Sequence, residues 1–159
     1  MQLLQNIFSS PLDLLKKVEN DKVTLEKCLV GFDEKAIREA LFNFVVGCYH
    51  LVDWVKAYHP NFKTDVYDLL NKNKYIGACR DLCNASKHVM IDLNKEPNIT
   101  YPPVLSDVAH SATGSITSSG ISEFRVKLQF GDGDRIPLEE LIVKVISAWE
   151  IFFNDKGLR

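Results

Sequence analysis

The sequence contains no long uninterrupted run of apolar residues. No stretch approaches the ~18 consecutive apolar residues that a membrane-spanning helix requires. The first stretch, MQLLQNIFSSPLDLLKK, has no basic segment ahead of its apolar residues, as a signal peptide would have. We therefore expect no membrane association, no signal peptide and a cytoplasmic location.

The sequence also has little excess charge of either sign. Lys plus Arg number 19 and Asp plus Glu number 21, which gives a formal net charge of −2. Sequence-independent binding to DNA or RNA depends on neutralising many phosphates, and no run of Lys and Arg is present to do so. The phosphate-binding patterns G-x-G-x-x-G and G-x-x-x-x-G-K-[ST] are missing too. We expect no nucleotide cofactor and no other cofactor.

The cysteines lack the spacing of a metal site. Cys79 and Cys83 are the closest pair and have three residues between them, whereas zinc sites usually combine two C-x-x-C pairs. Cys48, Cys79 and Cys83 fall on the apolar faces of predicted helices. We interpret them as small core residues in a reducing compartment, and we expect no bound metal.

Apolar residues at helical spacing dominate what is present. The chain has 159 residues and 46% apolar content, enough for one domain with a real core. A first helix begins at Ser10 and Pro11, and Asn20-Asp21 is the expected position of a break in it. Its predicted buried side comprises Leu12, Leu15, Val18, Val23 and Leu25. The strongest helix covers residues 33–58, between a capping Asp33 and Pro60. Its middle is apolar nearly all round, which predicts a central position. Its main apolar stripe comprises Ile37, Leu41, Phe44, Cys48, Leu51, Val52 and Val55.

The rest of the chain predicts two more helices, a β insertion and a closing helix. The helices cover residues 64–72 and 74–93, and the closing helix begins at Leu138. The packing face predicted for the closing helix comprises Leu138, Leu141, Ile142, Val145, Ile146, Trp149 and Phe152. Between them, residues 123–130 alternate apolar and polar side chains as a half-buried strand does, and residues 135–137 form a short return strand.

We therefore predict a mainly α (α+β) fold. It is a helical bundle of about four main helices, with a small antiparallel β-hairpin or three-stranded sheet before the last helix. Residues 1–159 form a single domain, comprising a helical part at 10–95, a loop and β insertion at 98–137 and a C-terminal helix at 138–154.

Two groups of polar residues interrupt the predicted central helices. Helical geometry places Arg80, Asn84, Lys87 and His88 within a sector roughly 100° wide. The other group is His50 and Asp53, three residues apart on the helix at 33–58. If the two helices pack antiparallel, Asp53 lies near Arg80 and His50 lies near Asn84.

This polar cluster has several interpretations. It is a buried structural network if Arg80 neutralises Asp53, and a binding surface if His50, Asp53 and Asn84 line an open groove. It is a catalytic site without metal if His88 is the general acid or base while Arg80 or Lys87 stabilises charge on a phosphate. It is a metal site if His50, Asp53 and His88 act as three ligands.

The segment CRDLCNASKH resembles part of the HEPN group of helical bundles. Nuclease members of that group carry an arginine, a polar residue and then four to six residues before a histidine. Here Arg80 and Asp81 begin such a pattern, and seven residues separate Arg80 from His88. The resemblance implies a helical bundle and, by its nuclease members, metal-independent cleavage of RNA.

The chain also resembles a group of small bacterial proteins of unknown function, over about residues 10–153. The similarity lies in two motifs, His-x-x-Asp-Trp at His50, Asp53 and Trp54, and Asn-x-x-Lys-His at Asn84, Lys87 and His88. This group implies the helical architecture but no activity.

The leading hypothesis is a cytoplasmic, HEPN-like interaction or regulatory module with a polar groove. It would form a homo-oligomer, such as a homodimer, or bind a protein partner or RNA. The alternative is a metal-independent ribonuclease of defence or toxin type that uses His88 and Arg80. The second alternative is a metal-binding protein with ligands at His50, Asp53 and His88.

Overall fold

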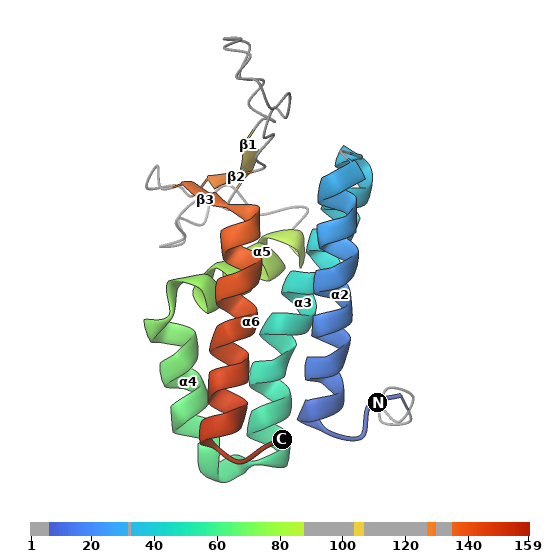
Figure 1. Cartoon of the computed structure of the whole chain (residues 1–159). Coiled ribbons are helices and arrows are strands. Elements are labelled where there is room, and N and C mark those ends of the chain that lie inside the picture. Colours follow the sequence, from blue (N-terminus) through green and yellow to red (C-terminus); the bar gives the residue numbers. More distant parts are fainter. Residues whose placement is uncertain (1–6, 32, 88–103, 107–126, 130–134) are drawn as a thin grey trace, which may run out of the picture.

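The protein is built mainly from helices. The computed structural model describes residues 7–31, 33–87, 104–106, 127–129 and 135–159. Within these ranges lie five α-helices, α2 (Pro11–Gly31), α3 (Glu34–Tyr58), α4 (Lys63–Lys72), α5 (Lys74–Lys87) and α6 (Leu138–Asp155), with a 3-10 turn, η1 (Pro60–Phe62), before α4 (Figure 1). The predicted mainly helical architecture is confirmed. None of the described helices is both long and apolar enough to cross a membrane.

Helix α2 begins at the predicted serine. The backbone N–H of Asp13 donates to Ser10 Oγ (3.2 Å), while the N–H and hydroxyl of Ser9 donate to the Asp13 carboxylate (3.1 and 2.6 Å). The hydrogen bonds from Ser9 hold the pKa of Asp13 below its ordinary value. The helix then continues unbroken through Asn20-Asp21, so the predicted break is wrong. An ion pair between Lys17 and Asp21, one turn apart, stabilises the helix at this point.

Helix α3 has the predicted ends and the predicted buried face. Asp33 Oδ1 accepts hydrogen bonds from the N–H groups of Lys35 (3.0 Å) and Ala36 (3.2 Å), and the helix ends one residue before His59. It contacts α2, α4 and α5, which confirms its central position, although Phe42 remains 48% exposed. All residues of its predicted apolar stripe are buried: Ile37, Leu41, Phe44, Cys48, Leu51, Val52 and Val55.

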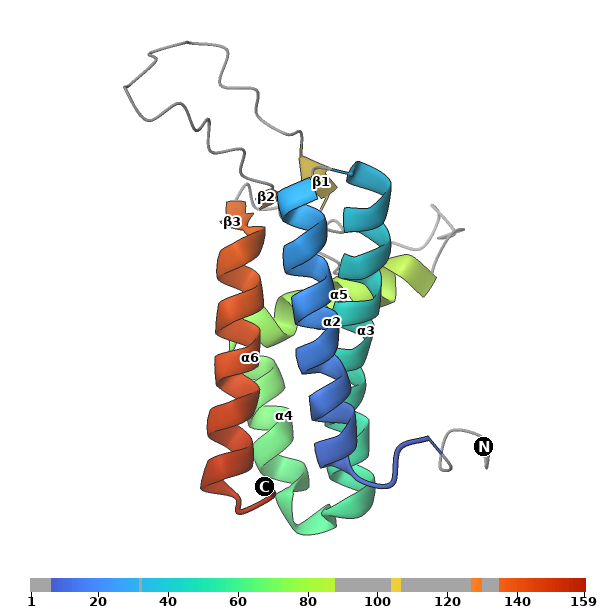
Figure 2. The ribbon, with the colours of Figure 1, turned by 45° about the vertical axis from the view of Figure 1, so that its right-hand side comes forward.

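Helix α5 crosses the bundle instead of running along α3. Helices α2, α3, α4 and α6 lie roughly side by side, and α5 lies across them in both views (Figures 1 and 2). A single residue, Asn73, joins α4 to α5. Its backbone is extended, and its side chain caps the new helix by accepting from the N–H groups of Tyr75 (3.0 Å) and Ile76 (3.2 Å). The expected antiparallel alignment of α5 with α3 is therefore wrong.

Three short strands precede α6. They are β1 (Val104–Ser106), β2 (Lys127–Gln129) and β3 (Arg135–Pro137), paired antiparallel in the order β1-β2-β3. Strand β2 falls inside the strand predicted at 123–130, and β3 coincides with the predicted return strand. The remaining residues of the predicted β insertion lie outside the described residues, so the full extent of the hairpin or sheet stays a prediction.

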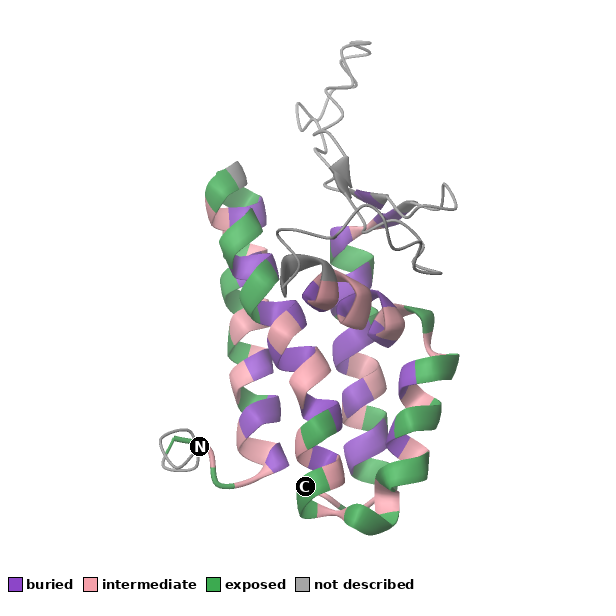
Figure 3. Cartoon of the chain, turned by 180° about the vertical axis from the view of Figure 1, so that it is seen from behind, coloured by how far each residue is buried: buried purple, intermediate pink, exposed green. Residues whose placement is uncertain are grey.

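One apolar core joins the helices. It includes residues of every described α-helix, together with Leu128 of β2 and Ile136 of β3. Buried residues lie where the helices face one another (Figure 3). In α2 the predicted core residue Val23 is 45% exposed, which corrects that assignment. The predicted packing face of α6 is buried throughout, and Phe153 joins it: Leu138, Leu141, Ile142, Val145, Ile146, Trp149 and Phe152.

Candidate functional site

Arg80 lies on α5 and is held by its neighbour in the sequence. Arg80 Nε donates to Asp81 Oδ1 at 2.8 Å, and the two side chains are 35% and 34% exposed. A guanidinium has further N–H donors besides Nε. The arrangement therefore presents a cation that is oriented by a carboxylate and is still in reach of solvent.

Asp53 forms a different contact from the one expected. Its side chain is 62% exposed, and Oδ1 lies 2.6 Å from Lys56 Nζ. Lys56 also donates to Tyr67 Oη (3.1 Å) and lies 4.8 Å from the centre of that ring, so it connects α3 to α4. The hydrogen bond to Asp53, and then the one to Tyr67, raises the pKa of Lys56. A buried Asp53–Arg80 pair is excluded by the exposure of Asp53, and each residue has a partner on its own helix.

The other members of the predicted cluster are placed only in part. His50 and Asn84 are half-buried on α3 and α5. Lys87 is the last described residue of α5 and its side chain is not described, and His88 lies outside the described residues. Among the described residues, no group of three or more His, Cys, Asp and Glu could hold a metal ion. The metal site with His88 as a ligand stays a prediction.

A pair of buried thiols marks the contact between α3 and α5. Cys48 and Cys79 are fully buried, and their thiols are joined by a hydrogen bond. Burial, with smaller contributions from Cys79 and Asp21, raises the pKa of the Cys48 thiol well above its ordinary value. Cys83 is also buried, and all four cysteines are free thiols. The prediction that Cys48, Cys79 and Cys83 are core residues is confirmed.

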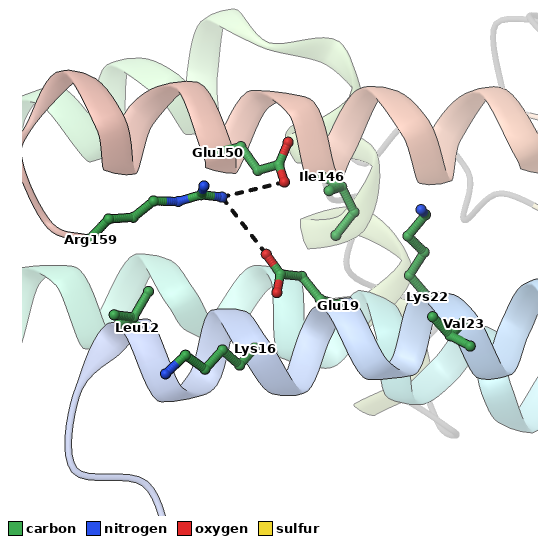
Figure 4. Close-up of a pocket in the computed structure, with 8 residues that line it drawn as sticks. All are labelled: Leu12, Lys16, Glu19, Lys22, Val23, Ile146, Glu150 and Arg159. Carbon is green, nitrogen blue, oxygen red and sulfur yellow. Dashed lines mark hydrogen bonds and ion pairs between the residues drawn. The ribbon is translucent and has the colours of Figure 1, made fainter.

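A charged groove between α2 and α6 was not predicted from the sequence. It has a volume of about 600 Å³. Figure 4 shows side chains of α2 on one side and side chains of α6 and Arg159 on the other. Its lining combines three apolar residues with five charged ones: Leu12, Val23 and Ile146, and Lys16, Glu19, Lys22, Glu150 and Arg159.

Arg159 connects the two sides of this groove. Its Nη2 lies 3.3 Å from Glu150 Oε1 on α6 and 3.9 Å from Glu19 Oε1 on α2 (Figure 4). The chain returns to this position because Gly157 adopts a φ of +64°, and the N–H of Leu158 donates to Phe153 O (2.8 Å). A glycine just after a helix is the sequence feature that could have indicated this turn.

A second hollow lies on the outer side of α3. It has a volume of about 420 Å³ and is lined by Arg38, Glu39, Phe42 and Asn43. All four residues come from the same helix, so this hollow has one wall, whereas the groove has two.

The described residues and their geometry are therefore the basis for assigning a function, because comparison with known proteins gives no match. No family model, curated protein sequence or solved structure matches this chain.

Proposed function

We propose that the protein is a helical interaction module that binds a partner in the groove between α2 and α6. The observation that carries this proposal is the combination of side chains in that groove. Val23 and the half-buried Leu12 offer apolar contact above the largely buried Ile146, and charged side chains of both signs lie among them on two packed helices. Protein interfaces commonly combine apolar contact with polar and charged groups in this way. This groove replaces the one expected around His50, Asp53 and Asn84.

The charges of the groove favour a protein over a polyanion as its partner. Arg159 lies against both Glu19 and Glu150, and Lys22 lies 3.5 Å from Glu26. A nucleic acid would place phosphates beside those carboxylates and would be repelled, because its binding depends on uncompensated cations. A protein surface with both signs of charge avoids this repulsion.

The proposal includes the wider assignment made from the sequence. We place the protein in the cytoplasm, with an HEPN-like bundle in which β1, β2 and β3 belong to a small sheet before α6. The paired strands and the mainly helical core support this architecture.

Chemical cross-linking tests the groove directly. An amine-reactive cross-linker is applied in extracts of cells that produce the protein, and intermolecular links are compared at groove and control lysines. Lys16 and Lys22 line the groove, whereas Lys63 and Lys74 are exposed at the starts of α4 and α5. We expect intermolecular links to concentrate at Lys16 and Lys22. Equal linking at Lys63 and Lys74 would show that the groove is not the binding surface.

A matched pair of variants adds a control for surface charge. Val23→Asp places a carboxylate in the groove, and Ile151→Asp places one on another face of α6. Val23 is 45% exposed and Ile151 57% exposed, so both variants should keep the fold. Only Val23→Asp should reduce the links at Lys16 and Lys22.

A metal-independent ribonuclease is the second candidate. One observation favours it: Arg80 is partly exposed and is oriented by Asp81, and six residues lie between Asp81 and His88. In this proposal His88 acts as general acid or base, and Arg80 or Lys87 stabilises charge on the phosphate. His88→Ala should then abolish RNA cleavage by the purified protein while leaving the thermal midpoint nearly unchanged. If the wild-type protein leaves RNA intact, this candidate is excluded.

A further inference from the structure

One outward face of α2 carries residues at the spacing used for pairing helices. Six residues follow one another at alternating intervals of four and three, so they form a single stripe along the helix. This stripe lies one residue beyond the core-facing positions Pro11, Leu15, Val18, Leu25 and Leu29, and it includes four groove residues. We call it the α2 stripe: Leu12, Lys16, Glu19, Val23, Glu26 and Val30.

Two of the three apolar members of the α2 stripe are exposed, and the third, Leu12, is half-buried. Val23 is 45% exposed and Val30 is 80% exposed. Helix α6 adds one exposed apolar residue, Val143 (56% exposed), on the face that also carries Glu150, whereas Ile146 on this face is only 7% exposed. In the groove, Arg159 and the two glutamates lie between Leu12 and Val23, and Lys22 stands beside Val23 and Ile146 (Figure 4).

We propose that a second copy of this chain occupies the groove, with its α2 antiparallel to the first α2 about a two-fold axis. This inference rests on the proposed function and names the partner. In an antiparallel pair of helices, each position of the stripe faces a fixed position of the copy. When the two-fold axis crosses α2 at the level of residue 21, Lys16 faces Glu26 of the second copy, and Val30 faces Leu12 of the second copy.

This register covers the whole stripe, including the highly exposed Val30. It aligns the whole stripe from Leu12 to Val30, an overlap of about 27 Å at 1.5 Å per residue. It forms two Lys–Glu pairs and two apolar pairs, because the two-fold axis repeats each contact, and it places Glu19 opposite Val23 of the second copy. Shifting the helices by one heptad toward Leu12 pairs Lys16 with Glu19 and Leu12 with Val23, but it leaves Glu26 and the highly exposed Val30 outside the overlap. A stripe with both a lysine and a glutamate at facing positions is complementary to itself, whereas a partner of uniform charge would be repelled by one of them.

Charge reversal tests both the partner and the register. The molar mass of the full chain is measured by light scattering or sedimentation equilibrium over a range of protein concentrations. We expect a dimer, with Kd about tenfold higher for Lys16→Glu or Glu26→Lys alone, because each reversal acts twice across the axis. The double variant Lys16→Glu/Glu26→Lys restores the pair with its signs exchanged, so its Kd should return to near the wild-type value.

Apolar variants test the far end of the same register. Val30→Asp places one carboxylate against each Leu12 of the dimer and should leave a monomer, while Ile151→Asp, also exposed (57%) but outside the stripe, should leave the dimer intact. Helix content measured by circular dichroism confirms that each variant folds.

The outcomes separate this inference from the proposed function. If the protein is a monomer at every concentration, the second copy is not the partner. The inference is also overturned if the protein dimerises but its Kd is unchanged by Val30→Asp and by both charge reversals. If the monomeric protein still forms links to other proteins at Lys16 and Lys22, the interaction module stands with a different partner. A monomer without links at those lysines overturns both.

Discussion

Asp21 and Asp53 both pair with a lysine on their own helix, but they differ in burial. The side chain of Asp21 is 18% exposed, and its partner Lys17 also reaches Asn43 O (3.5 Å) on α3. The side chain of Asp53 is 62% exposed. Exposed ion pairs contribute about 0–1 kcal/mol to the free energy of unfolding, and removing one partner of a more buried pair costs more.

We therefore expect Asp53→Ala to lower the free energy of unfolding by less than about 1 kcal/mol, and Asp21→Ala to lower it by about 1–2 kcal/mol. Urea denaturation followed by circular dichroism measures both losses. Equal losses would mean that the contact between Lys17 and α3 contributes nothing beyond a surface pair.

The Cys48 thiol makes stability depend on pH. Its pKa in the folded protein lies well above its ordinary value, whereas a thiol in the unfolded chain titrates near ~8.5. As pH rises past ~8.5, the unfolded chain loses this proton while the folded protein keeps it, so the free energy of unfolding falls.

Between pH 7.5 and 9.5 this single group should lower the free energy of unfolding by about 1.4 kcal/mol. Because other groups titrate over the same range, the measurement is the difference between wild type and Cys48→Ala in urea denaturation at both pH values. Stability that falls equally in the two proteins would contradict the prediction.

Helices α2 and α3 approach closely at Gly47. A Cβ at this position would lie 2.8 Å from Val18 Cγ2, and Val18 is fully buried. At Gly77 in α5, the nearest atoms to an added Cβ are Leu70 O at 3.6 Å and Arg80 Nη2 at 4.0 Å, which are ordinary contacts. The two glycines therefore offer a matched test of helix packing.

We expect Gly47→Ala to lower the free energy of unfolding by about 1–2 kcal/mol, because overpacking outweighs the better helix propensity of alanine. Gly77→Ala should raise it by up to about 1 kcal/mol, since only the propensity changes. Thermal and chemical denaturation measure the sign of the stability change in each variant. A shift in the same direction for both variants would mean that Val18 can move aside.

Helices with strong local signals could be predicted almost to the residue. Asp33 and Pro60 bound α3, and regular apolar spacing identifies the buried face of α6. The direction of α5 could not be predicted, because it depends on the backbone of one residue, Asn73. Val23 was misplaced because the core stripe and the outward stripe of α2 are adjacent, so an apolar side chain fits either pattern.

The candidate site was harder to predict for a related reason. Asp53 and Arg80 were matched across two helices, but each has a charged partner on its own helix, at Lys56 and Asp81. Such local pairs need no particular crossing angle between helices. The groove, in contrast, depends on the position of Arg159 between α2 and α6. The periodic spacing of apolar residues does not predict where a residue beyond the end of a helix lies.

The whole molecule should unfold as one unit. Every described α-helix contributes to the same apolar core, and Trp149 of α6 lies in it with Phe152 and Phe153 at 5.9 and 6.3 Å between ring centres. Within the described part of the chain, the buried Trp149 Nε1–H has no hydrogen-bond partner, so unfolding exposes it to water and shifts its fluorescence. Trp54 is half-buried and stacks on Tyr58, so Trp54→Phe removes the second emitter while keeping an aromatic ring there.

In Trp54→Phe, the fluorescence of Trp149 and the far-ultraviolet circular dichroism should change at the same urea concentration, because one shared core gives a two-state transition. If the Trp149 emission shifts before the helical signal is lost, α6 separates from the other helices first. Since α6 supplies one wall of the groove, that result would also mean that the groove opens below the unfolding transition. A partner that binds the groove would then raise the fluorescence midpoint more than the circular dichroism midpoint.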